Sequence, residues 1–415
     1  FSGGLDSTAL LHATARSGAR VLACHVHHGL QPQADDWASH CERQALQLGA
    51  AFACTRLTGA PAPGDSIEAW AREGRHRALH DMARGAGADL LLLAQHRRDQ
   101  AETFVLQAMR GAGLAGLSAM PRVQWRDGLC WARPWLDQPR EHIEAYAREH
   151  GLCWLDDPSN ADPRYARNRL RQTLWPAFPA AEAGLAQAAR WAQQADALAD
   201  EVATADLAGR ATAERLDLAG LSTLSPARAS NALRAWLSQH TTAPRSLIER
   251  LLAEWRPGLT ASWPAPHGVL HAYRDGLYWA APPTAAQPPA VVNLSRPGRY
   301  AQPGWGGSWC VEAGVPGIPA ARLGSLMQRP RGGAEQFQRT PASAPRSLKK
   351  ACQEAGLPPW RRGGPLLFDG AALVAVAGLG MDARAFAANG ELGLALRWVE
   401  DSALPQSEGE PSGPA

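Results

Sequence analysis

Short apolar runs alternate with helix-length amphipathic segments over about the first 155 residues. The runs "RVLACHV" (20–26) and "ADLLLLAQH" (88–96) have the continuous apolar character of strands buried on both faces. Strands that alternate with helices predict a parallel sheet covered by helices on both sides, with ligands at the carboxyl ends of its strands. We therefore predict an α/β fold with a doubly wound parallel sheet at the N-terminus.

The pattern changes twice along the rest of the chain. Residues 180–255 are rich in Ala, Leu, Gln and Arg, which predicts helices with polar faces. The stretch 256–298 is broken by Pro and Gly, and "APPTAAQPPA" (281–290) is typical of a linker. Short strand-like runs such as "GSWCVEA" and "AALVAVAGLGM" then surround a basic helix. The predicted parts are residues 1–178, a mainly helical middle domain at 179–285, a small α+β C-terminal domain at 295–400 and a disordered tail at 401–415.

Composition narrows the class of protein. The chain has 415 residues, a formal net charge of +3, and lysine only at positions 349 and 350. Its seven cysteines form no CxxC pair, which argues against a zinc ribbon, an iron–sulfur cluster or a disulfide scaffold. Because no signal peptide or apolar run of membrane-spanning length is evident, we expect a soluble cytoplasmic protein without a membrane partner.

The opening string "SGGLDS" has the character of a phosphate-binding turn. Its two glycines can aim successive N–H groups at one anion, and the apolar residues 8–11 open a helix whose positive end faces the same point. No lysine follows, so binding must rely on backbone N–H groups, hydroxyls and the helix dipole, with Asp6 placed to hold Mg²⁺. The predicted nucleotide-binding residues are Ser2, Gly3, Gly4, Leu5, Asp6 and Ser7.

Two further strings carry charged groups at helical spacing. In "AQHRRDQAETFVLQAMRGAG", Asp99 and Glu102 lie one turn apart at a strand's carboxyl end, where they can bind Mg²⁺ or an ammonium group. Asp99 can equally be a helix cap. In "DDPSNADPRYARNRLRQTLWP", Arg167 and Arg171 share a helix face and can grip adjacent phosphates, after a turn made by Asp157, Ser159 and Asn160.

Other charged stretches are more ambiguous. The strand end "HVHHGLQ" holds His25, His27 and His28, but adjacent side chains on a strand point to opposite faces, which disfavours a metal cluster. In "SIEAWAREGRHRAL", Glu68, Arg72 and Arg75 share a helix face that is either solvated or turned to a ligand. Residues 322–362 contain nine arginines and lysines against only two glutamates, the electrostatic pattern of a polyanion-binding surface.

The string at residues 2–7 resembles that of the PP-loop ATP pyrophosphatases, which have an adenine nucleotide alpha hydrolase-like fold. Among these enzymes the chain most resembles the tRNA(Ile)-lysidine synthetases. They carry a His-His-x-Asp-Asp-Gln-Ala-Glu-Thr string, an Asp-x-Ser-Asn turn before Arg-Asn-x-x-Arg, and C-terminal stretches similar to "RPRGG" and "LKKACQEAGLPPWRRGGPLLF". This sequence departs from the first string at Gln95 and Arg98.

The resemblance implies an ATP-dependent ligase that joins free L-lysine to C2 of the wobble cytidine in tRNA(Ile) with a CAU anticodon, using ATP and Mg²⁺. The activated cytidine is adenylated, and AMP and diphosphate are released. The residues implied as catalytic are Asp6, Asp99, Glu102, Arg167 and Arg171, and those implied in the adenosine pocket are His25, Val26 and His27. The residues implied in tRNA binding are Arg110, Asn168, Arg331, Lys349, Lys350 and Arg361.

Two other functions stay open at this point. Another PP-loop tRNA-modifying enzyme, such as a thiolase, is one alternative, although paired cysteines are absent from this sequence. A tRNA-binding homologue with weakened catalysis is the other, because of Gln95 and Arg98. The sequence also leaves a homodimer open.

A phosphate-binding turn of this kind normally follows a buried strand, whereas only Phe1 precedes Ser2 here. We therefore expect the functional protein to carry about ten to thirty further residues at its N-terminus, including an apolar strand.

The basic segment leads to a first prediction. Replacing both Lys349 and Lys350 with Ala should weaken tRNA binding and flatten its dependence on salt, because each phosphate contact releases counterions, with a slope of about 0.7–0.9 per contact. Binding titrations at several salt concentrations measure both effects. A slope identical to that of the unaltered protein would place the tRNA contacts elsewhere.

Overall fold

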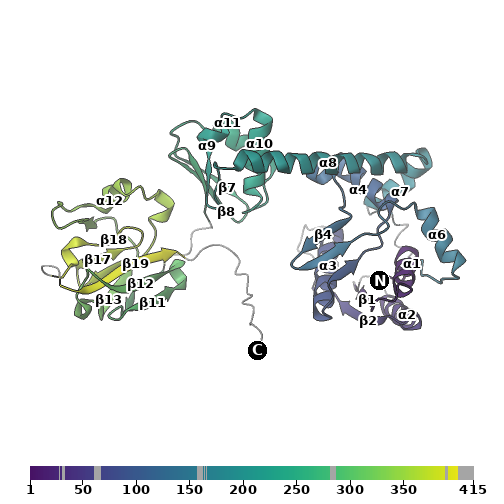
Figure 1. The fold of residues 1–415 in the computed structure, drawn as a ribbon, viewed down its shortest axis with the longest axis horizontal. Coiled ribbons are helices and arrows are strands. Elements are labelled where there is room, and N and C mark those ends of the chain that lie inside the picture. The colour runs from purple at the N-terminus through teal and green to yellow at the C-terminus, as the bar shows by residue number, and fades with distance from the viewer. Residues whose placement is uncertain are drawn as a thin grey trace. The chain divides into compact units, whose positions relative to one another are not determined.

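The computed structural model describes residues 1–27, 29, 33–59, 67–156, 162, 164, 166–280, 287–387 and 391–400 (Figure 1). The chain divides into two compact units, Phe1–Glu201 and Val202–Ala415. The tail at 401–415, His28, and the turn residues Asp157, Ser159 and Asn160 lie outside the described residues. No helix in the described part of the chain is long and apolar enough to span a membrane.

The first unit contains the predicted parallel strands. Strand β1 (Leu22–His27) pairs in parallel with β2 (Ala51–Arg56), and β3 (Leu90–Leu92) pairs in parallel with β5 (Leu129–Ala132). Strand β4 (Val123–Arg126) adds an antiparallel neighbour to β5, which the sequence pattern did not indicate. The parallel α/β class predicted for this region is confirmed.

Helices cover both faces of β1, as a doubly wound sheet requires. Cys24 and Val26 pack with α3, whereas Ala23 packs on the opposite side with Leu11 of α1 and Ala45 of α2. The helices of this unit are α1 (Leu5–Ala15), α2 (Ala34–Gln47), α3 (Ile67–Gly85), α4 (Arg97–Met109), α5 (Leu114–Leu117), α6 (Arg140–Glu149), α7 (Ala166–Ala177) and most of α8 (Ala181–Leu207).

The second unit begins with helices that pack on a sheet. Its helices are α9 (Leu218–Leu221), α10 (Pro226–Leu237) and α11 (Arg245–Glu254), and its strands are β6 (Arg215–Asp217), β7 (Ala261–Ala265), β8 (Gly268–Tyr273) and β9 (Gly276–Ala280). The strands form an antiparallel sheet in the order β6-β9-β8-β7 around a core that includes Leu233, Trp236 and Leu270.

That sheet occupies part of the stretch whose prolines and glycines suggested a break. The hairpin turns need left-handed backbone at His267, Arg274 and Asp275, with φ of +62°, +49° and +59°. The middle segment is therefore mostly helical up to Glu254 and forms strands from Ala261 to Ala280.

The remainder of the second unit is rich in strands. They are β10 (Ala290–Val292), β11 (Gly298–Gln302), β12 (Gly307–Gly314), β13 (Leu326–Arg329), β14 (Gln336–Phe337), β15 (Arg346–Ser347), β16 (Leu366–Asp369), β17 (Ala372–Val376), β18 (Gly380–Met381) and β19 (Gly393–Glu400). Two sheets, β10-β13-β16-β17-β18 and β11-β12-β19, share a core that includes Trp309, Leu326 and Val374. The predicted basic helix is α12 (Leu348–Glu354), and the strand-like runs at 307–313 and 371–381 are strands.

Candidate active site

The chain from Ser2 to Ser7 makes a tight turn into α1. Gly3 has a φ of +79°, and a Cβ at this position would lie 2.9 Å from the Cys41 sulfur, so the turn requires glycine here. Gly4 is the N-cap of α1 and no side chain caps the first N–H groups of the helix. These N–H groups lie at the positive end of the helix dipole, where they are available to an anion.

Two hydroxyl groups flank the same helix end. The Ser2 and Ser7 oxygens lie 3.0 Å apart, and the Ser7 hydroxyl donates to the Gly4 carbonyl at 3.1 Å. Leu5 buries its side chain against α6, which leaves its backbone as its polar contribution. The predicted phosphate-binding residues thus lie together around one uncapped helix end.

Asp6, on the first turn of α1, has an unsatisfied carboxylate. Its Oδ1 atom is buried and accepts no hydrogen bond, and it lies 3.8 Å from Nε2 of His96. Burial raises the pKa of Asp6 from its ordinary value, although His96 and Arg140 oppose the shift. A hard divalent cation would satisfy this oxygen, so the residue fits the predicted Mg²⁺ role.

His96 connects Asp6 to the acidic face of α4. Its ring atom Nδ1 caps the helix by accepting from the backbone N–H of Arg98 at 3.2 Å. Its backbone N–H donates to Oδ2 of Asp99 at 3.1 Å. Its Nε2 atom lies 3.4 Å from Asp99 Oδ2, and only 2% of the residue is exposed. His96 is not among the site residues predicted from the sequence, although its place directly before the helix, at a histidine position of the family string, was a signal.

The two predicted carboxylates on α4 meet the two predicted arginines on α7. Arg171 donates to Glu102 at 2.8 Å and to Asp99 at 3.2 Å, and Arg167 donates to the Thr103 hydroxyl at 2.8 Å. Glu102 is fully buried, and its second oxygen, Oε2, accepts no hydrogen bond and lies 3.6 Å from Nε of Arg167. Both predictions of a shared helix face are therefore confirmed, and the two faces contact each other.

The histidines at the end of β1 are buried separately from this network. His25 contacts the Phe1 carbonyl at 2.9 Å, and burial lowers its pKa. His27 contacts Asp35 at 3.1 Å. Val26 points away from them into the core against α3. Within the described ranges, no three His, Cys, Asp or Glu side chains are grouped as metal ligands.

The two departures from the family string have partners of their own. Arg98 donates to Glu182 of α8 at 2.8 Å and to Glu141 of α6 at 2.7 Å, and Arg97 donates to the other oxygen of Glu182 at 2.8 Å. Gln95 accepts from the buried Arg133 at 3.0 Å. Both departing side chains therefore bind residues other than His96 and Asp99.

Arginines gather beside this region on α3, on β4 and in the loop after β5. Burial and neighbouring arginines lower the pKa of Arg75, lower that of His76 to about 4 and lower that of Arg133 to about 10. Arg72, His76, Arg126 and Trp131 help to line a surface cavity of about 480 Å³. Crowded cations of this kind favour a bound anion. The spacing of Arg72 and Arg75 indicated part of this cluster, whereas nothing in the sequence indicated Arg133.

The predicted tRNA-binding residues lie in varied surroundings. Arg110, at the end of α4, and Lys349 and Lys350, on α12, are exposed. Asn168 is buried, and its side-chain amide donates to the Asp162 carbonyl at 2.9 Å. Arg361 donates to Glu214 at 2.8 Å. Arg331 is half-buried in the loop after β13.

Three family models match successive parts of the chain. Residues 1–178 match the PP-loop domain, residues 216–278 match the TilS substrate binding domain, and residues 326–398 match the TilS substrate C-terminal domain. The tRNA(Ile)-lysidine synthase of Ralstonia nicotianae is 44% identical, over 93% of this chain and 89% of that protein. Those of Alkalilimnicola ehrlichii and Pseudomonas putida are 40% and 37% identical, over 92% and 91% of this chain and 88% and 91% of theirs.

The contacts of Arg98 lead to a prediction about stability. Arg98→Asp, which introduces the residue common in the family string, should lower the melting temperature. It leaves Glu182, whose side chain is only 7% exposed, with Arg97 as its one remaining arginine partner and places a second carboxylate beside it. A buried oxygen that loses its donor costs about 1–3 kcal/mol. Calorimetry should show a larger loss than for Arg43→Asp, the same charge reversal at an exposed position of α2. Equal melting temperatures for the two variants would contradict this role.

Proposed function

The chain belongs to the tRNA(Ile)-lysidine synthase family, and we propose that it joins lysine to C2 of the wobble cytidine of tRNA(Ile) with a CAU anticodon. Enzymes of this family are ATP-dependent ligases, and the PP-loop domain accounts for the use of ATP. The proposal rests mainly on the N-terminus of α1, which no side chain caps and which lies next to the unpaired carboxylate oxygen of Asp6. The buried ion pair between Glu102 of α4 and Arg171 of α7 supports it. We place the reaction in the cytoplasm, where tRNA is used.

The first half-reaction activates the base. The cytidine O2 attacks the α-phosphorus of ATP, diphosphate leaves, and O2 now carries AMP. In our proposal the N–H groups after Gly4 and the Ser2 and Ser7 hydroxyls hold the phosphates. His25, Val26 and His27 line the adenosine side, and Asp6 holds Mg²⁺. When bound, this ion supplies positive charge that offsets the charge developing on the phosphate oxygens.

The second half-reaction forms the new bond. The lysine amine attacks C2, the C2–O2 bond breaks, and AMP leaves with O2. We propose that Asp99 and Glu102 orient the bound lysine, because both are acidic and the second oxygen of Glu102 has no hydrogen bond. Arg171 keeps these carboxylates in place, and Arg167 is positioned to reach a phosphate or the activated base.

We assign the tRNA contacts mainly to basic side chains, because the tRNA backbone is negatively charged. We propose that Arg110 and the cluster around Arg72 bind tRNA near the reacting base, and that Arg331, Lys349, Lys350 and Arg361 bind it through the C-terminal domain. Asn168 contributes through the Asp162 loop that it holds.

A direct assay tests the function. The purified chain should release AMP from ATP only when both lysine and a tRNA(Ile) transcript with a CAU anticodon are present. A transcript with a CAC anticodon retains the wobble cytidine and is the control for anticodon reading. AMP release that does not depend on lysine would contradict the proposal. We do not expect Arg98→Asp to raise this rate, because Arg98 serves the packing of α4.

Asp6 gives a sharper test of the site. Asp6→Ala should abolish AMP release, with a loss of at least about a hundredfold, because the phosphates lose the cation that the carboxylate holds. Its tRNA affinity should stay close to that of the unaltered chain. Asp36→Ala removes the same charge from an exposed position of α2 and serves as the control. Turnover of Asp6→Ala at the level of Asp36→Ala would refute the assignment.

A further inference from the structure

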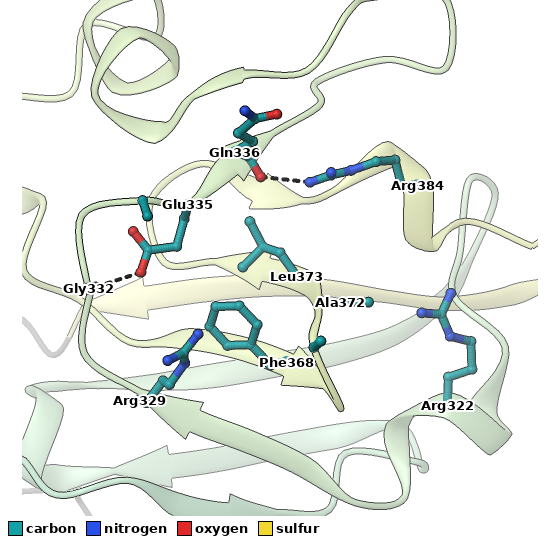
Figure 2. A pocket seen from close by; sticks show the side chains of 11 residues that line it. Arg322, Arg329, Gly332, Glu335, Gln336, Phe368, Ala372, Leu373 and Arg384 are labelled. Carbon is teal, nitrogen blue, oxygen red and sulfur yellow. Dashed lines mark hydrogen bonds between the residues drawn. The ribbon is translucent and has the colours of Figure 1, made fainter.

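A cavity of about 520 Å³ opens over β13, β16 and β17 in the C-terminal part of the second unit. Its lining includes Arg322, Arg329, Glu335, Phe368, Leu373 and Arg384 (Figure 2). Figure 2 shows Phe368 and Leu373 between Arg329 on one side and Arg322 on the other. The volume lies within the range of about 300–1,000 Å³ typical of sites for small ligands and single building blocks of polymers.

The floor of this cavity is apolar and rigid. Phe368 and Leu373 are 4% and 7% exposed and belong to the cluster that also contains Phe337, Leu348 and Val376. Ala372 beside them is exposed and small, so it leaves the space above the floor open. A flat, weakly polar group in this cavity can therefore bury part of its surface beside these side chains.

Arg329 is the cation in the lining whose charge is least compensated. Its guanidinium lies over the Phe368 ring, with Cζ 4.0 Å from the ring centroid, and it forms no ion pair within the described ranges. By contrast, Arg322 pairs with Asp369 at 2.9 Å and Arg384 pairs with Asp382 at 2.7 Å.

Glu335, the acidic residue of the lining, does not neutralise Arg329. It accepts from the backbone N–H groups of Gly332 and Gly333, the latter at 2.8 Å. The cavity thus combines an arginine held against an aromatic ring, an apolar floor and two further guanidinium groups at its edge. RNA-binding proteins recognise unpaired bases with this combination, because a base stacks on an arginine or aromatic plane while nearby cations hold its phosphate.

We propose that this cavity, which we call the Arg329 pocket, binds one unpaired nucleotide of the tRNA. The base stacks against Arg329 above Phe368, and the flanking phosphates face Arg322 and Arg384. This inference rests on the proposed function, which supplies a tRNA as substrate. It assigns a base-binding site to the C-terminal domain, beyond the general positive charge of residues 322–362.

Three variants of the full chain separate stacking from charge. Arg329→Gln removes the plane and the charge, Arg329→Lys keeps the charge, and Arg397→Gln removes one exposed arginine from β19, outside the pocket. We expect Arg329→Gln and Arg329→Lys each to weaken the Kd for the tRNA about five- to tenfold, since stacking on a side chain contributes strongly per base. Arg397→Gln should change it less than about twofold at the same salt concentration.

Nuclease footprinting of the bound tRNA locates the contact. We expect both Arg329 variants to lose protection at one or two unpaired nucleotides while protection of the anticodon persists. Equal affinities and footprints for Arg329→Gln and Arg397→Gln would overturn the proposal, and so would an Arg329→Lys variant that behaves like the unaltered chain. Titration with free CMP and AMP tests whether the pocket binds a free nucleotide instead of a nucleotide of the tRNA. Micromolar binding that Arg329→Gln abolishes would make this a free-nucleotide site instead.

The assay of AMP release distinguishes a failure of the Arg329 pocket proposal from a failure of the proposed function. If the unaltered chain releases AMP with lysine and tRNA while the Arg329 and Arg397 variants bind tRNA equally, the pocket proposal alone fails. If the unaltered chain neither binds the tRNA nor releases AMP, both proposals fail.

Discussion

The contact of α7 with α4 through buried charges is the constraint on which the candidate site depends. Glu102 is fully buried, and a carboxylate in that position is stable only with a partner, which Arg171 provides at 2.8 Å. The same arginine reaches Asp99, which contacts His96, which lies next to Asp6. This series of contacts connects the glycine turn before α1 to α7.

This arrangement explains how acidic and basic groups can serve one reaction without cancelling each other. Each carboxylate of α4 uses one oxygen for Arg171, and the second oxygen of Glu102 stays without a hydrogen bond. The crowded arginines Arg75 and Arg133 lie on α3 and in the loop after β5, and their charge helps to lower the pKa of His76. Separate acidic and basic surfaces suit a reaction in which an amine and a polyanion meet at one carbon.

The two departures from the family string show how a local change can be compensated. Arg98 at a position commonly occupied by Asp would be unfavourable beside other cations, but Glu182 and Glu141 accept its hydrogen bonds. Gln95 in place of His accepts from Nε of the buried Arg133, while the Pro121 carbonyl accepts from Nη1 of the same guanidinium. His96 and Asp99 contact each other in this chain beside Gln95 and Arg98, so the hypothesis of weakened catalysis finds no support in these contacts.

The sequence alone determined the local features: the parallel α/β class, the glycine turn before α1, the shared faces of Asp99 with Glu102 and of Arg167 with Arg171, and the basic helix α12. Each of these features depends on residues that are close together in the sequence, because the periodicity of a helix or a strand sets their relative positions. Only the tertiary structure decided that the two charged faces bind each other, that His96 joins them to Asp6, that Arg361 pairs with Glu214, and that Arg329 lies over Phe368. These contacts join residues far apart in the chain, and they depend on how the elements pack, which no local pattern records.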